Sequence, residues 1–142
     1  MIDVIFCSAD EVADDFLRFA VIIARHKNKF VFCRHKDRTT WEVPGGHRET
    51  GERIIDAAKR ELYEESGAVE FELSPVAVYG VKDGSGVTYG MLFFADIKVL
   101  DDIPEEYEIA EIIISETMPE KLTYPEIQPK LWEFARKEMK ID

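Results

Sequence analysis

The segment between residues 46 and 68 concentrates side chains that can bind a cation. Arg60, Glu61, Glu64 and Glu65 stand close together in it. Residues three and four apart are neighbours on a helix, where like charges cost roughly 0.2–0.5 kcal/mol per pair. Arg60 can pair with Glu64 and orient it, but one guanidinium cannot neutralise three acids. A divalent cation can, and ligands that are all oxygen atoms favour magnesium, manganese or calcium over zinc.

A helix is predicted over residues 52–66, and it places these carboxylates at the edge of the core. Thr50 can cap its start, and Gly67 can adopt the left-handed conformation that ends it. At about 100° per residue, Glu61 and Glu65 lie beside an apolar stripe, which consists of Ile54, Ile55, Ala58 and Leu62. The three glutamates are therefore expected at the boundary between core and solvent.

The same residues match the Nudix box, the signature of the Nudix hydrolases, at every specified position: Gly46, Glu52, Arg60, Glu61, Leu62, Glu64, Glu65, Gly67 and Ala68. The resemblance implies an α/β/α sandwich with a mixed β-sheet. It also implies a loop-helix-loop that holds magnesium or manganese on the glutamates and cleaves the diphosphate bond of a nucleoside diphosphate linked to another group. A solvated acidic helix in an acidic protein is the alternative interpretation of the glutamates.

Hydrolysis of a phosphoanhydride requires neutralised phosphate oxygens and an oriented water. We expect Glu61, Glu64 and Glu65 to bind the metal, and one of them or a carboxylate outside the box to accept the proton from that water. Glu108 and Glu111 are the outside candidates, because family members often recruit a further glutamate from this region. Acids on a solvated strand edge are the alternative for both.

Substrate contacts are predicted before and within the glycine loop. Arg34 and Arg38 stand in a basic cluster, and guanidinium groups grip phosphate bidentately, so both are candidate anchors for the outer phosphates. A solvated turn is the alternative for each. Gly45 and Gly46, where the chain enters the box, complete the expected contacts, together with Tyr124 in a proline-bearing loop.

Length and composition predict a small enzyme. The 142 residues, 46% of them hydrophobic, suit one domain over residues 1–142. A net charge of −11 argues against binding to nucleic acid polymers or anionic membranes, and leaves room for a small anionic substrate that arrives with its cation. Two cysteines and an N-terminus without a signal-peptide pattern predict a cytoplasmic protein with reduced thiols. A homodimer is a further expectation, since symmetric dimers are the commonest oligomers.

Apolar and β-branched runs predict five strands, at residues 19–24, 30–33, 76–81, 88–99 and 109–114. A short strand is expected before Pro44, and a last helix near Pro125. Pro129 indicates an early kink in that helix or a later start.

The leading interpretation is a magnesium-dependent hydrolase of a nucleoside triphosphate, an oxidised one included, because a short chain without extra domains resembles the triphosphate-sanitising members. Nucleotide sugars, ADP-ribose and dinucleoside polyphosphates stay open. An inactive nucleotide-binding module would have a broken glutamate set, and a diphosphate isomerase would need further acid/base residues, for which Cys33 is little evidence. A P-loop nucleotidase is excluded, because the chain has no Gly-x4-Gly-Lys-Ser/Thr.

Overall fold

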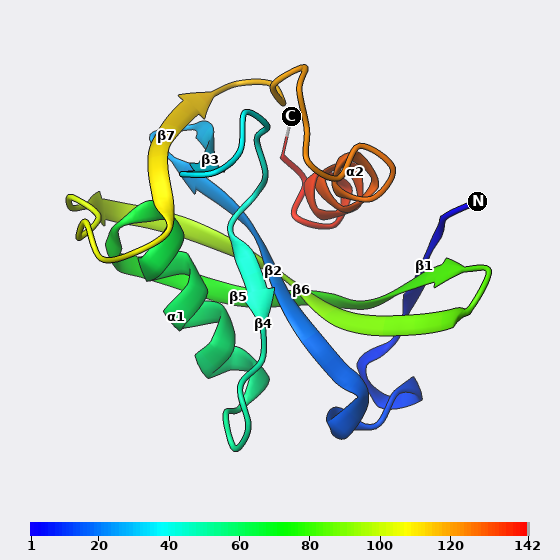
Figure 1. The fold of residues 1–142 in the computed structure, drawn as a ribbon. Coiled ribbons are helices and arrows are strands. Elements are labelled where there is room, and N and C mark those ends of the chain that lie inside the picture. The colour runs from blue at the N-terminus through cyan, green and yellow to red at the C-terminus, as the bar shows by residue number, and fades with distance from the viewer. Residues whose placement is uncertain (142) are drawn as a thin grey trace.

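The computed structural model describes residues 1–141 and places a β-sheet between two α-helices (Figure 1). The helices are α1 (Ile54–Ser66) and α2 (Gln128–Glu138). The strands are β1 (Asp3–Cys7), β2 (Leu17–His26), β3 (Lys29–His35), β4 (Gly45–His47), β5 (Ala68–Asp83), β6 (Gly86–Leu100) and β7 (Ile109–Ser115). Short 3-10 turns at Ala9–Glu11 and Asp14–Phe16 lead into β2.

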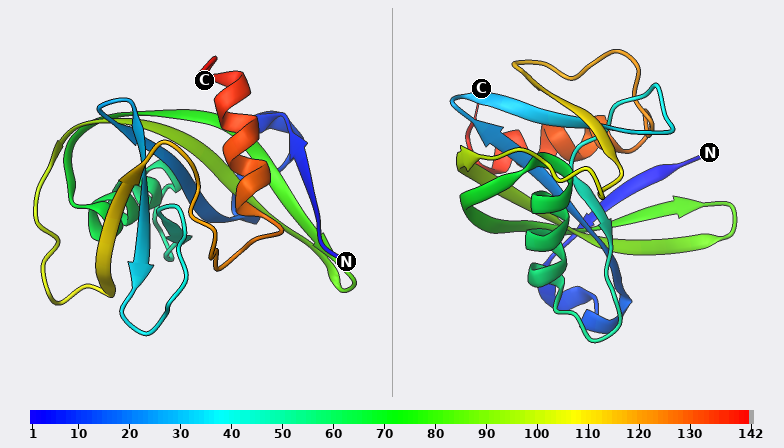
Figure 2. Two further views of the ribbon diagram at one scale, coloured as in Figure 1. Left: turned by 90° about the horizontal axis from the view of Figure 1, so that it is seen from above. Right: turned by 60° about the vertical axis from the view of Figure 1, so that its left-hand side comes forward.

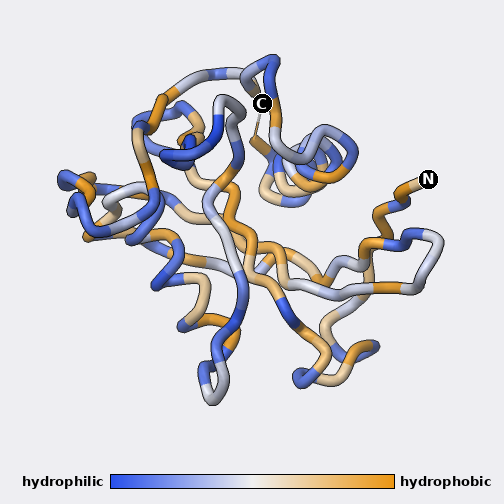
Figure 3. The backbone as a smooth tube through the Cα atoms, in the orientation of Figure 1, coloured by the Kyte–Doolittle hydropathy of each residue, from blue (hydrophilic) through white to orange (hydrophobic). Residues whose placement is uncertain are grey.

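The sheet is mixed, as the sequence predicts. Its strand order is β1-β5-β6-β2-β3-β7, and β4 pairs with β2. Strands β2 and β6 run parallel in the centre, and the other pairs are antiparallel. Central β2 is covered on both faces, which explains its nearly continuous apolar run. Figure 3 shows the hydrophobic residues along these central strands.

The two helices cover opposite faces of the sheet, so the predicted α/β/α sandwich is confirmed (Figure 2). Side chains alternate across a strand: Ile22 of β2 packs in the cluster with Leu62 of α1, whereas Ile23 packs with Leu131 and Ala135 of α2. Each helix thus buries its apolar stripe against one set of alternate residues. Within residues 1–141, neither helix is long and apolar enough to cross a membrane.

Helix α1 begins two residues later than predicted. Arg53 is its N-cap residue and makes no side-chain cap, so the predicted cap at Thr50 is wrong. The reason is a tight turn before the helix: Glu52 N–H donates to the Glu49 carbonyl, and the Glu52 carbonyl accepts from the Arg48 guanidinium. The predicted end is confirmed, because Gly67 has a φ of 80°.

Three other boundaries differ from the sequence predictions. Strand β5 starts at Ala68, directly after the helix, rather than at residue 76. The short strand lies after Pro44, as β4, and not before it. Helix α2 begins at Gln128, so Pro129 occupies its first turn, where a missing N–H costs nothing. Strand β1 was not predicted; within residues 1–141 it is an edge strand that pairs only with β5.

Gly67→Ala should destabilise the protein. An alanine at the φ of Gly67 costs about 1–2 kcal/mol from backbone conformation alone, and its Cβ would also collide with the Asp101 carbonyl oxygen. Gly84 is the matched control, because a Cβ there meets open space, so Gly84→Ala should change the free energy of unfolding by less than about 0.5 kcal/mol. Urea denaturation measures both; equal effects would contradict this account of the helix end.

Candidate active site

The site is built around the segment that crosses from β3 to β2. Cys33 and Glu42 exchange two backbone hydrogen bonds of 2.8 and 2.9 Å. Ile22 N–H then donates to the Pro44 carbonyl at 2.9 Å, and β4 continues along β2. This crossing is possible because β2 pairs with β3 only at its far end, through Arg25 and His26. The backbone after Pro44 is therefore fixed against the sheet and beside α1.

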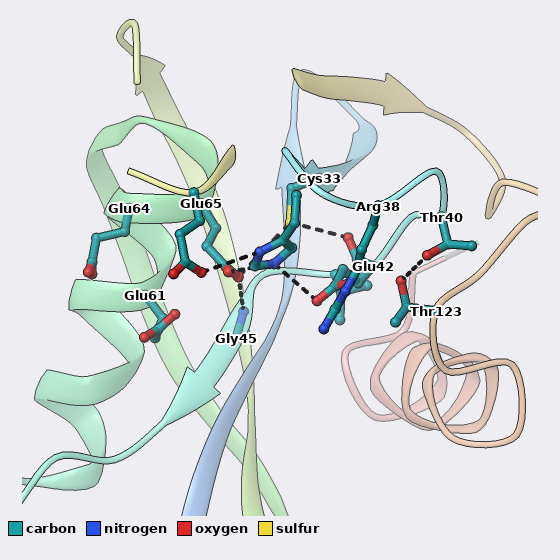
Figure 4. Close-up of polar contacts among 12 residues, drawn as sticks. Cys33, Arg38, Thr40, Glu42, Gly45, Glu61, Glu64, Glu65 and Thr123 are labelled. Atoms are coloured by element: carbon teal, nitrogen blue, oxygen red, sulfur yellow. Dashed lines mark hydrogen bonds and ion pairs between the residues drawn. The ribbon is translucent and has the colours of Figure 1, made fainter. Parts of the chain in front are cut away.

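Two glycines let the carboxylates of α1 approach that backbone closely. Gly45 N–H donates to Glu65 Oε1 at 2.8 Å (Figure 4). A Cβ on Gly46 would lie only 2.5–2.7 Å from the three carboxyl atoms of Glu61, so any larger residue would displace that side chain. The predicted substrate residues Gly45 and Gly46 thus lie against two of the predicted metal ligands.

Arg60 gathers the acids on its side of the helix. Its Nη1 lies 2.6 Å from Glu61 Oε1 and 3.3 Å from Glu64 Oε2, which includes the pairing expected from the sequence. Two further hydrogen bonds, of 2.8 and 3.0 Å, go to Glu52, and another reaches the His47 carbonyl at 3.0 Å. The hydrogen bonds from Arg60 hold the pKa of Glu52 below its usual value. Glu52 thus shares the Arg60 guanidinium with Glu61 and Glu64.

The acids nearest the core are not fully compensated by Arg60. Burial, and then the charge of Glu65, raises the pKa of Glu61 to about 7. Burial also raises the pKa of Glu65, although hydrogen bonds with His35 and Gly45 act in the opposite direction. This surplus of buried negative charge and the set of carboxylate oxygens fit a hard divalent cation. Among residues 1–141, no three acidic, histidine or cysteine side chains are already arranged to hold a metal ion. The carboxylates instead contact Arg60, His35 and the Gly45 N–H.

The acids are exposed to a cavity of about 300 Å³ that also receives the loop before β7. Glu61, Glu64 and Glu65 line one side of it, and Glu108 lines the other. Glu111, the second outside candidate, lies on β7 and forms a 3.2 Å ion pair with Arg34. The structure therefore brings Glu108 to the glutamate cluster and keeps Glu111 with an arginine.

The two predicted phosphate anchors are both engaged with protein groups. Besides Glu111, Arg34 donates to the Arg38 carbonyl at 3.0 Å. Arg38 Nη1 lies 2.7 Å from Glu42 Oε2. Hydrogen bonds to Glu42 and, more weakly, to Tyr124 raise the pKa of Arg38. Arg38 and Tyr124 thus lie together, whereas Arg34 turns toward β7.

A second, largely apolar cavity of about 420 Å³ adjoins the glycine pair. Its walls come from β2, β4, β5, β6, α2 and the loop before α2, and they include Gly46, Tyr79, Tyr124, Gln128 and Leu131. Gln128 is anchored there, because its Oε1 accepts the Val43 N–H at 2.9 Å. The backbone at Gly45 and Gly46 therefore has carboxylates on its α1 side and an apolar cavity on its α2 side.

Two residues at the centre of the site were missed by the sequence analysis. The sequence analysis assigned no role in the site to His35 or to Glu42. In the structure, His35 Nε2 lies 3.2 Å from Glu42 Oε1 and 3.1 Å from Glu65 Oε2. Strand alternation could have placed His35, since Val31 and His35 share the face of β3 that packs on α1. Glu42 had no such signal.

Comparison with known proteins identifies the family. The protein-family model described as "NUDIX domain" matches residues 15–138. The chain belongs to the Nudix family. This confirms the resemblance read from residues 46–68 and places the chain among pyrophosphohydrolases, enzymes that act on acid anhydrides.

Individual Nudix relatives agree with this assignment. One relative is YtkD of Bacillus subtilis, which is described as a "putative 8-oxo-dGTP diphosphatase". It is 31% identical over 114 residues, which are 80% of this chain and 72% of YtkD. An RNA pyrophosphohydrolase of Francisella philomiragia is 33% identical over 58 residues, 41% of this chain and 37% of that protein. The crystal structure of the Bacillus subtilis pyrophosphohydrolase BsRppH shares the fold with a TM-score of 0.79 at 24% identity, covering 98% of this chain and 93% of that one.

Glu61→Gln should change how the stability of the metal-free protein depends on pH. The pKa of Glu61 is raised from 4.5 to about 7 in the folded state. The protonated side chain therefore contributes to the free energy of unfolding at low pH, and this contribution is lost as pH rises through 7. A neutral glutamine keeps that stability. Measured by urea denaturation in EDTA, the advantage of Glu61→Gln over the wild type should grow by about 2 kcal/mol from pH 5 to pH 8. A difference that stays constant across this range would contradict the burial argument.

Gly46→Ala should impair activity far more than stability. The new Cβ would collide with the end of the flexible Glu61 side chain, which can swing away at little cost to the fold. A displaced catalytic group can reduce turnover by about 10²-fold. Thermal melting should therefore stay close to that of Gly84→Ala, while hydrolysis falls. Normal hydrolysis by Gly46→Ala would show that the close approach of Gly46 and Glu61 has no functional role.

Proposed function

We propose that this Nudix enzyme is a magnesium- or manganese-dependent hydrolase of nucleoside triphosphates, oxidised ones included. The observation that carries the proposal is the two-sided arrangement at Gly45 and Gly46. The cluster of α1 carboxylates lies on one side of this backbone, and the apolar cavity lies on the other. A nucleotide has the same division, into a charged phosphate chain that travels with its cation and a flat aromatic base whose ring faces are apolar.

The metal ligands in this proposal are Glu61, Glu64 and Glu65. When bound there, the cation supplies neutralisation of charge on the phosphate oxygens. Arg60 keeps Glu61 and Glu64 together on one side of the helix, and Gly45 holds Glu65 through its N–H. The proton from the attacking water goes to one of these glutamates or to Glu108, which lines the same cavity.

The apolar cavity is proposed to take the base. Its volume of about 420 Å³ suits a small ligand, and Tyr79 and Tyr124 supply aromatic surface. In this proposal, the arginine that meets phosphate near this cavity is Arg38, which lies beside Tyr124 at the Glu42 carboxylate. The likeness to YtkD supports a triphosphate of this kind over nucleotide sugars, ADP-ribose and dinucleoside polyphosphates.

A second candidate substrate is the triphosphate at the 5′ end of RNA. The local similarity to the RNA pyrophosphohydrolases favours it. The net charge of −11 argues against extended contact with an RNA backbone. An RNA substrate would therefore be bound mainly through its terminal nucleotide.

Glu64→Gln should abolish most of the activity and leave the fold intact. Glu64 makes one ion pair, to Arg60, and its side chain is 24% exposed, so a glutamine fits without disturbing the core. We expect wild-type protein with Mg²⁺ to hydrolyse dGTP or 8-oxo-dGTP, and the variant to turn over at least about 10²-fold more slowly. Release of pyrophosphate or phosphate, with and without EDTA, measures this.

Asp56→Asn is the matched control for that substitution. Asp56 lies on α1 and pairs with Arg53, away from the glutamate cluster, so its loss should leave turnover within about twofold. The same assay with a 5′-triphosphorylated RNA oligonucleotide compares the two substrate classes. A Glu64→Gln variant with near wild-type turnover would overturn the ligand assignment. A folded wild-type protein that is silent on every substrate would favour a nucleotide-binding module or an isomerase instead.

A further inference from the structure

We propose that His35 is a positioning residue that holds Glu65 in its working orientation by bridging it to Glu42. This inference rests on the proposed function, in which Glu65 binds the metal. Glu65 is the most deeply buried of the three α1 glutamates, with 7% of its surface exposed. A ligand in such a position needs its carboxylate fixed by neighbours, because solvent cannot do it.

Both oxygens of Glu65 are held, and from different strands. Gly45 of β4 donates its N–H to Oε1 at 2.8 Å. His35 of β3 places Nε2 3.1 Å from Oε2. The hydrogen bond from Gly45 and the close contact with His35 together restrain the rotation of the carboxylate about its last bond. Glu64, by contrast, is held in the described part of the chain through one oxygen, by Arg60 at 3.3 Å.

The bridge continues to a second buried carboxylate that has its own anchor. His35 Nε2 is 3.2 Å from Glu42 Oε1, and Arg38 Nη1 is 2.7 Å from Glu42 Oε2. Glu42 is 6% exposed. Along this series of contacts, cationic or proton-donating groups thus alternate with carboxylates, in the order Arg38, Glu42, His35, Glu65. Arg38 and the Cys33 backbone hold Glu42, so the imidazole lies between two carboxylates that are each anchored separately, and its Nδ1 lies 3.7 Å from Glu108 Oε2.

The bridge also spans the two halves of the site. Glu42 belongs to the wall of the apolar cavity, together with Gly45 and Gln128, whereas Glu65 belongs to the acidic cavity. Removal of His35 should therefore loosen the ligand for the metal and leave the rest of the apolar cavity in place. The expected signature is a weaker metal affinity and a lower kcat, with a smaller change in KM for the nucleotide.

Two substitutions of His35 separate positioning from a simple packing role. His35→Leu keeps the bulk and removes the donor, whereas His35→Gln keeps an amide donor near the position of Nε2. Loss of a group that orients a metal ligand commonly weakens metal affinity or activity 10–100-fold. We expect His35→Leu to bind Mn²⁺ at least tenfold more weakly, measured by electron paramagnetic resonance of free Mn²⁺, with a similar fall in kcat on dGTP. His35→Gln should recover most of both.

His26→Leu is the matched control for loss of a buried imidazole. His26 lies on β2 and contacts the Ile97 carbonyl through Nδ1 at 3.0 Å, and it takes no part in either cavity wall described for the site. It should lower the melting temperature and leave Mn²⁺ affinity and kcat at the wild-type level. If His35→Leu lowers the melting temperature but keeps wild-type Mn²⁺ affinity and kcat, then His35 has a packing role and the inference is overturned.

A double-mutant cycle with Glu65→Gln tests whether His35 acts through Glu65. If His35 acts through Glu65, His35→Leu should have little further effect on Mn²⁺ affinity or kcat in the Glu65→Gln background. Fully additive effects would overturn the inference while leaving the proposed function standing. A wild-type protein that neither binds Mn²⁺ nor hydrolyses nucleotides would overturn the proposed function, and this inference with it.

Discussion

The arrangement of the site depends on one constraint, the close approach of carboxylates on α1 to a backbone that carries no side chains. Gly45 donates to Glu65, and the space where a side chain of Gly46 would stand is filled by Glu61. Acids so close to the core lose solvation, and this raises the pKa of Glu61 to about 7. Arg60 offsets part of the charge through Glu61, Glu64 and Glu52. The remaining charge makes this edge of the helix suited to a cation.

The fold serves this constraint by fixing the helix and the glycine segment separately. Helix α1 buries its apolar stripe against one face of the sheet, so its inner edge cannot rotate away from β4. The glycine segment is tied to β3 through Cys33 and to β2 through Ile22. Helix α2 packs on the opposite face and completes the apolar cavity. Each half of the site thus belongs to a different layer, and the glycine segment lies between them.

The sequence predicted those features that depend on interactions between residues close together in the chain. The amphipathic spacing predicted α1 and the inner-edge position of its glutamates, and Gly67 ends the helix as expected. The helix start was mistaken because Arg48, from outside the helix, takes the Glu52 carbonyl. The pairing of Arg34 with Glu111 and of His35 with Glu65 joins residues far apart in the chain. No periodicity within one segment contains these pairings. Strand alternation could have placed His35 on the face toward α1, but its contacts with Glu65 and Glu42 emerged only from the structure.

The central claim is that the carboxylates of α1 form a divalent-cation site beside Gly45 and Gly46. A crystal structure of the protein with Mn²⁺, with anomalous data to locate the ion, tests it most directly. The account predicts an anomalous peak bound by oxygens of Glu61, Glu64 or Glu65, with Glu61 turned from Arg60 toward the ion. A fully occupied peak elsewhere, or no peak in the acidic cavity at millimolar Mn²⁺, would contradict the account.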